Sequence, residues 1–339
     1  MGLCRKTRAC FFSIVLSCAA LLLQGCFAQK AEAQTLPPET VSSESSGDVQ
    51  ISSAEGPKVY MTTNITPAGL MAVYEALGLA ANGKVAVKIS TGEPGNTHYL
   101  SPNLIQGLVQ RVNGTIVESN TAYGGRRASA AAHYQVARDH GFAAIAPVVI
   151  LDERADMSIP VSGGRHLKED IVGARFSEFD FHIVLSHFKG HQMGGFGGAL
   201  KNMSIGYASS AGKAWIHSAG RSRTSMWGGD QNAFLESMAE AAKAVSDANR
   251  GRMLYINVMN HLSVDCDCNG NPAAPTMADI GILASLDPVA LDQACVDLVY
   301  AAKDSRSLIE RIESRNGLLT ITHAERLGLG SKTYQLIRL

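Results

Sequence analysis

Cysteine is scarce in the part of this 339-residue chain that can form a folded domain. Four of the seven cysteines lie within the first 26 residues, and the three that remain are Cys266, Cys268 and Cys295. A disulfide framework needs an even set of cysteines, so the sequence excludes a small disulfide-stabilised scaffold. With 46% hydrophobic residues, the chain can instead bury one large core or two modest ones.

An excess of charge of either sign is also missing. Thirty Lys and Arg residues balance thirty Asp and Glu residues, and no run of like charges stands out. Nucleic-acid-binding surfaces carry a basic stripe, so we expect no nucleic-acid partner. The chain also lacks a Gly-x-Ser-x-Gly elbow, a His-Glu-x-x-His helix, a P-loop and a Rossmann fingerprint, so no standard catalytic motif names a reaction.

The N-terminal segment has the pattern of an export signal. Arg5, Lys6 and Arg8 precede a short apolar run, Phe11–Leu23. The run is too short for a convincing membrane span and is typical of the h-region of a secretory signal. Residues 1–25 are therefore predicted to be a lipoprotein-type signal peptide.

Two cleavage sites compete at the end of this signal. Leu23, Gly25 and Cys26 resemble a lipobox, which would make Cys26 the lipidated first residue of an exported, membrane-anchored lipoprotein. Cleavage after Ala31–Ala33 would instead give a soluble secreted or periplasmic protein. The sequence favours the lipoprotein, which would contact the membrane through its N-terminal lipid only.

Residues 26–56 are rich in Ser, Glu, Ala, Gln and Pro and poor in large apolar residues, which predicts a flexible tether. In residues 57–339, short apolar strands alternate with helices. This pattern predicts an α/β fold, a layered and mainly parallel sheet flanked by helices, as one body or as two lobes. Loops that follow strands would then meet at one edge of the sheet. These loops are 90–98, 120–127, 187–201 and 260–271.

The stretch from His182 to His217 carries the first candidate site. A short apolar strand, Ile183–Leu185, is followed by what we interpret as a glycine-rich loop with several histidines and lysines. His187 and His191 are four residues apart and would share a face of a helix or of a strand, and Lys189 would join them only on a strand. These histidines could transfer protons, or they could simply hydrogen-bond the loop.

Further residues of the same stretch are candidates for ligand binding. Lys201, like Lys189, could bind an anionic group of a substrate, and both lysines are counted with His187 and His191 as candidate catalytic residues. The candidate cofactor-binding residues are glycines that allow close backbone approach, together with one histidine. They are Gly194, Gly195, His217, Gly124 and Gly125. The last two belong to a loop that could cradle an anion at a helix N-terminus, or could be an ordinary turn.

A second candidate site lies around the Cys-Asp-Cys motif. If the segment is extended, Cys266 and Cys268 share a face about 6.6 Å apart at Cα. That spacing suits two thiolates on one metal ion, with Asp265 and His261 as further candidate ligands. A disulfide, which prefers about 5.5–6 Å, and a pair of unligated thiols stay open as alternatives. Cys295 follows Leu291 by four residues within a predicted helix and is expected to be a buried core residue.

Three runs of the sequence resemble a known family. They are LSHFKGHQMGGFGGALKNMSIG, SVDCDC and DIGILASLDPVALDQACVDLVY. The chain resembles the domain-of-unknown-function family 362 over roughly Lys58–Leu339, and more narrowly the branch called "uncharacterized Fe–S center protein". The resemblance implies an α/β domain with an iron–sulfur association and no established reaction.

This chain departs from many members of that branch in one respect. They carry a ferredoxin-like insert with repeated Cys-x-x-Cys spacing, whereas the corresponding interval here, Ser218–Asp230, holds no cysteine. A cubane cluster bound by four cysteines cannot be built from three, so we expect no such cluster within one chain. The cofactor is expected to be a metal ion, with iron or another iron–sulfur arrangement as the form that the resemblance implies.

The sequence thus predicts a protein that binds a metal or a metal-containing cofactor for redox or metal-dependent chemistry. The small-molecule ligand is expected to be anionic. The alternative is a non-catalytic surface protein that captures a metal or a small anion. Because the strand Ile183–Leu185 and the strand Arg252–Val258 would both end at one edge of the sheet, the two motif loops are predicted to form a single site.

Overall fold

The computed structural model describes residues 55–339. The predicted signal peptide and nearly all of the predicted tether lie outside the described residues. No helix within residues 55–339 combines the length and apolarity that a membrane span requires.

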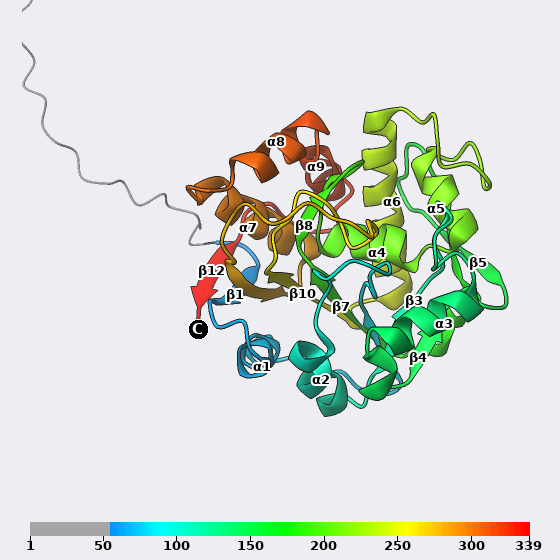
Figure 1. Cartoon of the computed structure of the whole chain (residues 1–339). Coiled ribbons are helices and arrows are strands. Elements are labelled where there is room, and N and C mark those ends of the chain that lie inside the picture. The colour runs from blue at the N-terminus through cyan, green and yellow to red at the C-terminus, as the bar shows by residue number, and fades with distance from the viewer. Residues whose placement is uncertain (1–54) are drawn as a thin grey trace, which may run out of the picture. The chain divides into compact units, whose positions relative to one another are not determined.

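The main sheet has eight strands in the order β12-β1-β11-β10-β7-β2-β3-β4 (Figure 1). Their bounds are Lys58–Thr62 (β1), Val85–Lys88 (β2), Thr115–Glu118 (β3), Val148–Ile150 (β4), Phe181–His187 (β7), Met253–Met259 (β10), Gly281–Ser285 (β11) and Gln335–Arg338 (β12).

Seven strands of this sheet run in the same direction. β11 pairs antiparallel with both β1 and β10, whereas the other neighbours in the sheet pair in parallel. The central strand β7 sets the register of its neighbours, because Ile183 lies opposite both Leu254 of β10 and Val87 of β2. The predicted layered α/β fold with a mainly parallel sheet is confirmed, and the described residues form one compact unit rather than two lobes.

The sheet is buried on both faces. Successive side chains of a strand point to opposite faces, so neighbouring residues belong to different cores. In β7, Ile183 and Leu185 belong to the apolar core on one face, whereas Val184 belongs to the core on the other. β10 alternates in the same way, with Ile256 on the first face and Tyr255 on the second. The lysine and glutamate side chains of β1, β2 and β3 lie at the ends of their strands.

Helices cover both faces and give three layers (Figure 1). Helices α1 and α2 lie on one face, and α4, α6, α7 and α9 pack on the other. The helix bounds are Pro67–Ala76 (α1), Pro102–Arg111 (α2), Ala130–Asp139 (α3), Ala199–Tyr207 (α4), Ser210–His217 (α5), Gln231–Asn249 (α6), Pro288–Ala301 (α7), Arg306–Ser314 (α8) and Leu318–Arg326 (α9). Thr66, Asp230 and Asp287 cap α1, α6 and α7 as their side chains predict.

The interpretation of 186–217 as one glycine-rich loop was wrong. The hairpin formed by β8 (Lys189–His191) and β9 (Gly195–Gly197) comes first, and α4 and α5 follow it. The glycines concentrate in the hairpin, and the remaining residues form two short helices whose buried side chains pack against α6. A second hairpin pairs β5 (Asp156–Pro160) with β6 (Glu169–Gly173).

The N-terminus of α4 is fixed by a buried carboxylate. Asp292 of α7 accepts hydrogen bonds from the backbone N–H groups of Ala199 and Leu200 at 2.8 and 2.9 Å, and from Asn257 Nδ2 at 2.7 Å. Gly198 allows this contact, because a Cβ there would lie 2.3 Å from Asp292 Oδ1. Burial raises the pKa of Asp292 to about 6 despite these donors. The carboxylate thus joins α7, β10 and α4.

We predict that Asp292→Ala lowers the free energy of unfolding by about 2–4 kcal/mol, because it leaves buried donors without an acceptor. Urea unfolding followed by circular dichroism measures this change. Glu310→Ala is the matched control, since Glu310 makes an exposed ion pair with Arg306 that contributes little. Equal midpoints for the two variants would show that the Asp292 contacts do not stabilise the fold.

Candidate functional site

A cavity of about 400 Å³ lies beyond the carboxyl ends of β2, β3 and β7. Its lining comes from the segments that follow these strands and from the Cys-Asp-Cys loop after β10. Lys88, Glu118 and His187 are the last residues of their strands, and all three line the cavity. The prediction that the strand-end loops meet at one edge of the sheet is thereby confirmed.

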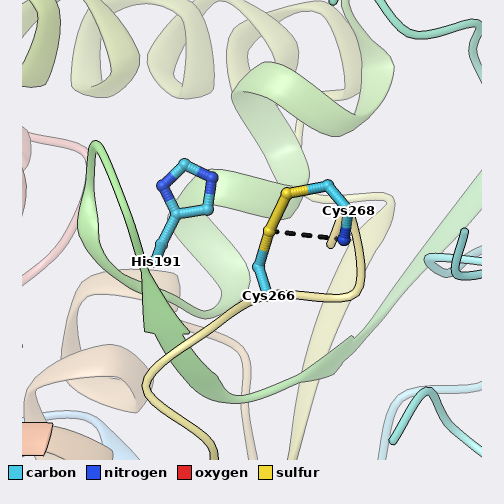
Figure 2. Close-up of side chains that lie close together, drawn as sticks. All are labelled: His191, Cys266 and Cys268. Carbon is cyan, nitrogen blue, oxygen red and sulfur yellow. Dashed lines mark hydrogen bonds between the residues drawn. A yellow bond between two sulfur atoms is a disulfide. The ribbon is translucent and has the colours of Figure 1, made fainter. Parts of the chain in front are cut away.

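The two cysteines of the Cys-Asp-Cys motif lie in the wall of this cavity. Cys266 and Cys268 form a disulfide, with Cα atoms 5.2 Å apart (Figure 2). The backbone N–H of Cys268 also lies 3.3 Å from Cys266 Sγ. His191, Cys266 and Cys268 each offer one ligand atom, and these three atoms all lie within 4.8 Å of one another. The predicted meeting of the histidine loop and the cysteine loop is confirmed, whereas their action as one binding site stays a prediction.

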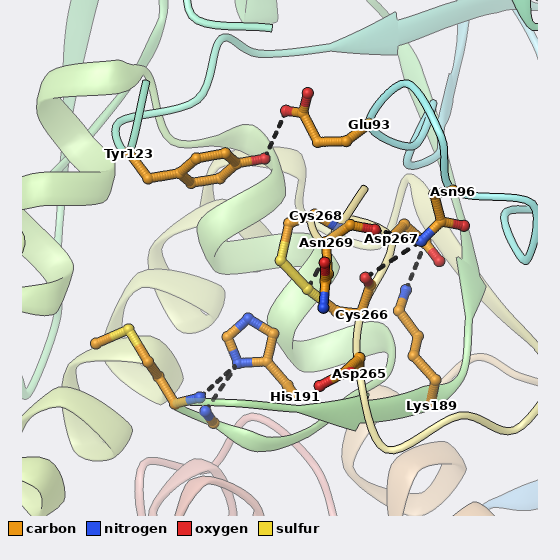
Figure 3. Close-up of a disulfide and its surroundings, with 12 residues drawn as sticks. Glu93, Asn96, Tyr123, Lys189, His191, Asp265, Cys266, Asp267, Cys268 and Asn269 are labelled. Carbon is orange, nitrogen blue, oxygen red and sulfur yellow. Dashed lines mark hydrogen bonds and ion pairs between the residues drawn. A yellow bond between two sulfur atoms is a disulfide. The ribbon is translucent and has the colours of Figure 1, made fainter. Parts of the chain in front are cut away.

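The ring of His191 is held by the turn that follows it. The backbone N–H groups of Met193 and Gly194 donate to His191 Nδ1 at 3.2 and 2.8 Å (Figure 3). Burial, with a contribution from Lys201, lowers the pKa of His191 well below its usual value, so the ring is neutral. Because amides can only donate, Nδ1 keeps its lone pair and the proton of the neutral ring lies on Nε2.

The donor set fits a soft metal ion under two conditions. Two sulfurs at about 2.3 Å from one tetrahedral ion are roughly 3.8 Å apart, which the 4.8 Å group accommodates. Thiolates are the ligating form, so the disulfide must first be reduced. To bind the metal through Nε2, the neutral ring of His191 would have to carry its proton on Nδ1 and give up the two amide donors there; to bind it through Nδ1, the metal would have to replace those donors.

A buried ion cluster supports the cysteine loop from behind. Asp267 lies between the two cysteines, beside Lys189 (Figure 3), and accepts from Lys189 Nζ at 2.7 Å. It also accepts from His187 Nδ1 at 2.8 Å. Burial opposes the charge of Asp267, but Lys189 and His187 outweigh it and hold the pKa of the carboxyl well below its usual range. Lys189 Nζ also donates to His187 O, and His187 Nε2 to Asn260 O. Both ring nitrogens of His187 and the amine of Lys189 therefore hold the loop in place.

A second ion cluster closes the opposite wall. Glu118 accepts from Lys88 Nζ at 2.8 Å and from Arg127 at 3.2 Å, and Arg127 also pairs with Glu93 at 3.1 Å. Burial disfavours ionised Glu118, but Lys88, with His133 and Arg127, lowers its pKa to about 2. Every charge in this cluster has an opposite partner.

Two further amines of the wall have no carboxylate partner. Lys213 Nζ donates to Ala208 O at 2.5 Å, and Lys201 Nζ makes no hydrogen bond or ion pair with any described residue. Burial lowers the pKa of Lys201 to about 7, and the positive charge of Lys189 adds to the effect. Burial likewise lowers the pKa of Lys213 to about 8.

His217 offers an acceptor to the same cavity. Its Nδ1 donates to Lys213 O at 2.7 Å, and its ring stacks on Phe234 with centroids 4.4 Å apart. Burial lowers the pKa of His217 to about 4, so the ring is neutral at pH 7. Nε2 therefore carries a lone pair, the opposite tautomer to that of His191.

Two of the predicted metal ligands lie away from the cavity. His261 is exposed and stacks with His98, with centroids 5.8 Å apart, while its backbone N–H donates to Asp279. Asp265 accepts from Ala273 N at 3.0 Å and from Arg311 at 3.4 Å, and it does not line the cavity. The sequence analysis proposed His261 and Asp265 as ligands beside the cysteines. In the structure, His191 lies beside the cysteines instead.

The predicted glycines have supporting positions. Gly194 donates to His191, and Gly195 approaches Gly317, whose Cα would lie 2.9 Å from an added Cβ. The Gly124–Gly125 loop does surround an anion, but the anion is the chain's own Glu93 carboxylate. Glu93 accepts from Tyr123 Oη at 2.8 Å and from the backbone N–H of Arg126 at 3.2 Å. None of the four predicted glycines lines the cavity.

Several cavity residues were missed by the sequence analysis. Lys88 and Glu118 carried a signal, because a charged residue that ends a buried apolar strand usually lies at a functional edge of an α/β sheet. Lys213 lies within the His182–His217 stretch but was not singled out, because nothing in the sequence shows that its helix turns the side chain toward the cavity. Trp227 lies ten residues beyond that stretch and carried no signal. Asp267 was read as part of the motif without a role, and it proves to be the ion that holds both motif loops together.

Comparison with known proteins places the chain in a family. A family profile described as "Domain of unknown function (DUF362)" matches residues 85–297. A search of curated proteins found no match. The predicted family is thus confirmed, whereas its iron–sulfur branch stays a prediction.

Two solved structures are similar to part of the chain. The lactate racemase apoprotein from Thermoanaerobacterium thermosaccharolyticum is 15% identical, with a TM-score of 0.38 over 59% of this chain and 50% of that one. A structural-genomics crystal structure of a protein from Thermotoga maritima is 12% identical, with a TM-score of 0.39 over 77% of this chain and 58% of that one. The chain spans between half and three fifths of the length of these two proteins. By its sequence match, the protein belongs to the DUF362 family.

Proposed function

We propose that the cavity is the active site of an enzyme that acts on a small anionic molecule, with a metal ion held by Cys266, Cys268 and His191 in the reduced protein. The observation that carries the proposal is the group of three ligand atoms within 4.8 Å of one another. They lie in the wall of a cavity that also presents the amines of Lys201 and Lys213.

The donor set indicates which metals suit the site. Two thiolates and an imidazole favour zinc, copper(I) or iron over magnesium or calcium, which prefer oxygen ligands. Three protein ligands leave the fourth tetrahedral position open, as in catalytic rather than structural zinc sites. When bound, such an ion supplies Lewis acidity, or electron transfer if it is iron or copper.

The side chains around the cysteines divide into holding and reacting groups. Lys189 and His187 orient the cysteine loop through Asp267 and have no free position for a substrate proton. Lys201 has a pKa of about 7, so its amine can take up or release a proton at neutral pH. His217 Nε2 can accept a hydrogen bond from a bound hydroxyl or acid group.

A second candidate function uses the two cysteines without a metal. It is favoured by the disulfide itself and by the Nε2–H of His191, which can donate to a thiolate. An anionic thiol would attack one sulfur to form a mixed disulfide, and a second thiol would attack that mixed disulfide. The two thiols would then leave as a disulfide, and Cys266 and Cys268 would keep both electrons as the dithiol. A non-catalytic binding protein is less well supported, because amines with pKa values near neutrality are typical of reacting groups.

We also propose that the enzyme is exported and attached to the membrane by a lipid on Cys26. The lipobox-like run Leu23–Cys26 supports this location, and an oxidising compartment would allow the Cys266–Cys268 disulfide to form. Cell fractionation of the full chain tests it: Cys26→Ser should release the protein from membranes or block its processing. A mature N-terminus at Gln34 on wholly soluble protein would contradict the anchor.

Metal binding is predicted to require both cysteines. Anaerobically reduced protein should bind one zinc or iron(II) ion per chain, measured by elemental analysis after gel filtration. The double variant Cys266→Ser, Cys268→Ser should bind none, and His191→Ala should bind at least about tenfold more weakly, since even outer-shell partners contribute that much.

Cys295→Ala is the matched control for this experiment, because Cys295 is a buried thiol whose sulfur receives a hydrogen bond from Asn257. It should keep its metal. Retention of the metal by the double serine variant would contradict the proposed metal site. Iron and acid-labile sulfide both near four per chain would instead point to a cubane with ligands from outside the cysteine set.

Lys201 is predicted to titrate near neutrality. Competitive acetylation across pH 5–11, read by mass spectrometry, should show half-maximal labelling of Lys201 near pH 7. Below that pH the amine is protonated and unreactive, and above it the neutral amine reacts. Lys201→Arg confirms the assignment by removing the labelled peptide. Half-labelling near the ordinary lysine value of about 10.4 would contradict the burial argument.

A further inference from the structure

We propose that the cavity binds an amphiphilic organic anion, with an aromatic body against Trp227 at the mouth and an oxyanion group between Lys201 and Lys213. The inference deepens the proposed function by naming the class of substrate, and it rests on that function only in taking the cavity as the substrate site. It is carried by two features of the cavity wall, an imbalance of charge and an exposed aromatic rim.

The charge imbalance follows from a count of the ionic side chains in the wall. Five lysine and arginine side chains line the cavity, against the two carboxylates Glu118 and Asp267. Lys88 pairs with Glu118, and Lys189 pairs with Asp267. Arg127 has a further partner, Glu93, outside the lining. Lys201 and Lys213 are the two cations that remain.

Burial is the main cost to both charged amines and lowers the pKa of each. The charge of Lys189 lowers the pKa of Lys201 further, against a smaller opposite effect of Asp267. At Lys213, Asp152 and Glu118 offset only part of the cost of burial. Both side chains line the same cavity, and the charge of Lys213 also lowers the pKa of Lys201. An oxyanion between them would stabilise both protonated amines through charge-assisted hydrogen bonds. The wall is therefore complementary to an acidic group.

The mouth of the cavity is aromatic and apolar. Trp227 is 67% exposed and Tyr123 is 37% exposed, although both line the cavity, and Met193 and Met226 lie in the same wall. Only 6% of the residues in the chain are aromatic, and Trp227 makes no stacking contact within the described residues. Covering the exposed indole with a flat apolar group is favourable, because it removes apolar surface from water and allows the rings to stack.

A single molecule can satisfy both features. A cavity of about 400 Å³ holds a compound of roughly drug size, larger than an inorganic anion or a short aliphatic acid. A free phosphate or a small carboxylate would reach the lysines but leave Trp227 in water. An aromatic carboxylate, sulfate or phosphate ester would cover both, and would lie beside Cys266 and Cys268.

The test uses metal-free protein with the disulfide intact, in the Trp215→Phe background. Trp227 is then the single tryptophan of the chain, so its fluorescence reports on the mouth. The probes are 2-naphthoate and 2-naphthyl phosphate, with neutral 2-naphthamide and inorganic phosphate as matched controls. Both aromatic anions should quench Trp227 and bind at least about tenfold more tightly than either control, and the tighter of the two identifies the oxyanion.

Variants separate the two halves of the proposed contact. Lys201→Gln and Lys213→Gln should each weaken 2-naphthoate binding by about tenfold, since each removes a charge-assisted hydrogen bond. Lys201→Arg should keep most of the affinity. Trp227→Ala, followed by calorimetry, should weaken it by about three- to tenfold through lost stacking. At pH 8, calorimetry in buffers of different ionisation enthalpy should show proton uptake on binding, because the oxyanion draws a proton onto Lys201.

Naphthamide that binds as tightly as naphthoate, or inorganic phosphate that binds as tightly as naphthyl phosphate, would overturn the inference. So would unchanged affinity in both lysine-to-glutamine variants. Because these measurements need no metal, their failure is distinct from failure of the metal centre. Protein that binds zinc through its cysteines but ignores both aromatic anions would keep the proposed metal site and lose this substrate class.

Discussion

The arrangement of the site depends on one buried carboxylate. Asp267 is almost completely removed from water, so its charge is tolerated only because Lys189 and His187 contact it directly. Those two residues belong to the end of β7 and to β8, whereas Asp267 belongs to the loop after β10. The ion cluster therefore holds two loops, distant in sequence, against each other. The same contact places Cys266 and Cys268 beside His191, because the cysteines flank Asp267 on both sides.

Most cationic side chains of the cavity wall are paired with carboxylates, but two lysines have no carboxylate partner. The cluster of Glu118 satisfies Lys88 and Arg127, and the cluster of Asp267 satisfies Lys189. Lys201 and Lys213 extend from α4 and α5, the two helices that follow the β8–β9 hairpin. Sulfur, imidazole and amine are thus brought together by consecutive elements of one stretch and by a single loop from elsewhere. This combination can hold a metal ion and an anion at once.

The sequence was sufficient for the sheet, and for the meeting of the two motif loops, because apolar strands of period two leave their charged residues at the strand ends. It was not sufficient for the ligand set. His261 adjoins the cysteine motif in the sequence, yet its backbone adopts a φ of 45° and its ring stacks on His98 instead. His191 reaches the sulfurs because the β8–β9 hairpin lies against the cysteine loop, where Gly190 N donates to Ser263 O at 2.8 Å, and a contact between segments so far apart in sequence is not visible in a local pattern. The many glycines before α4 also made the segment look like a loop in the sequence. The first turn of α4 is held by Asp292, which lies in a helix distant in the sequence.

The central claim is that Cys266, Cys268 and His191 act as one metal site in the reduced protein. X-ray absorption at the zinc edge of reduced, zinc-loaded full-length protein tests it most directly. The account predicts two sulfur neighbours at about 2.3 Å and nitrogen or oxygen neighbours at about 2.0–2.1 Å, with both sulfur distances lost when Cys266 and Cys268 are changed to serine. A zinc shell made of nitrogen and oxygen alone would contradict the account, because the two reduced cysteines would then not be ligands of the metal.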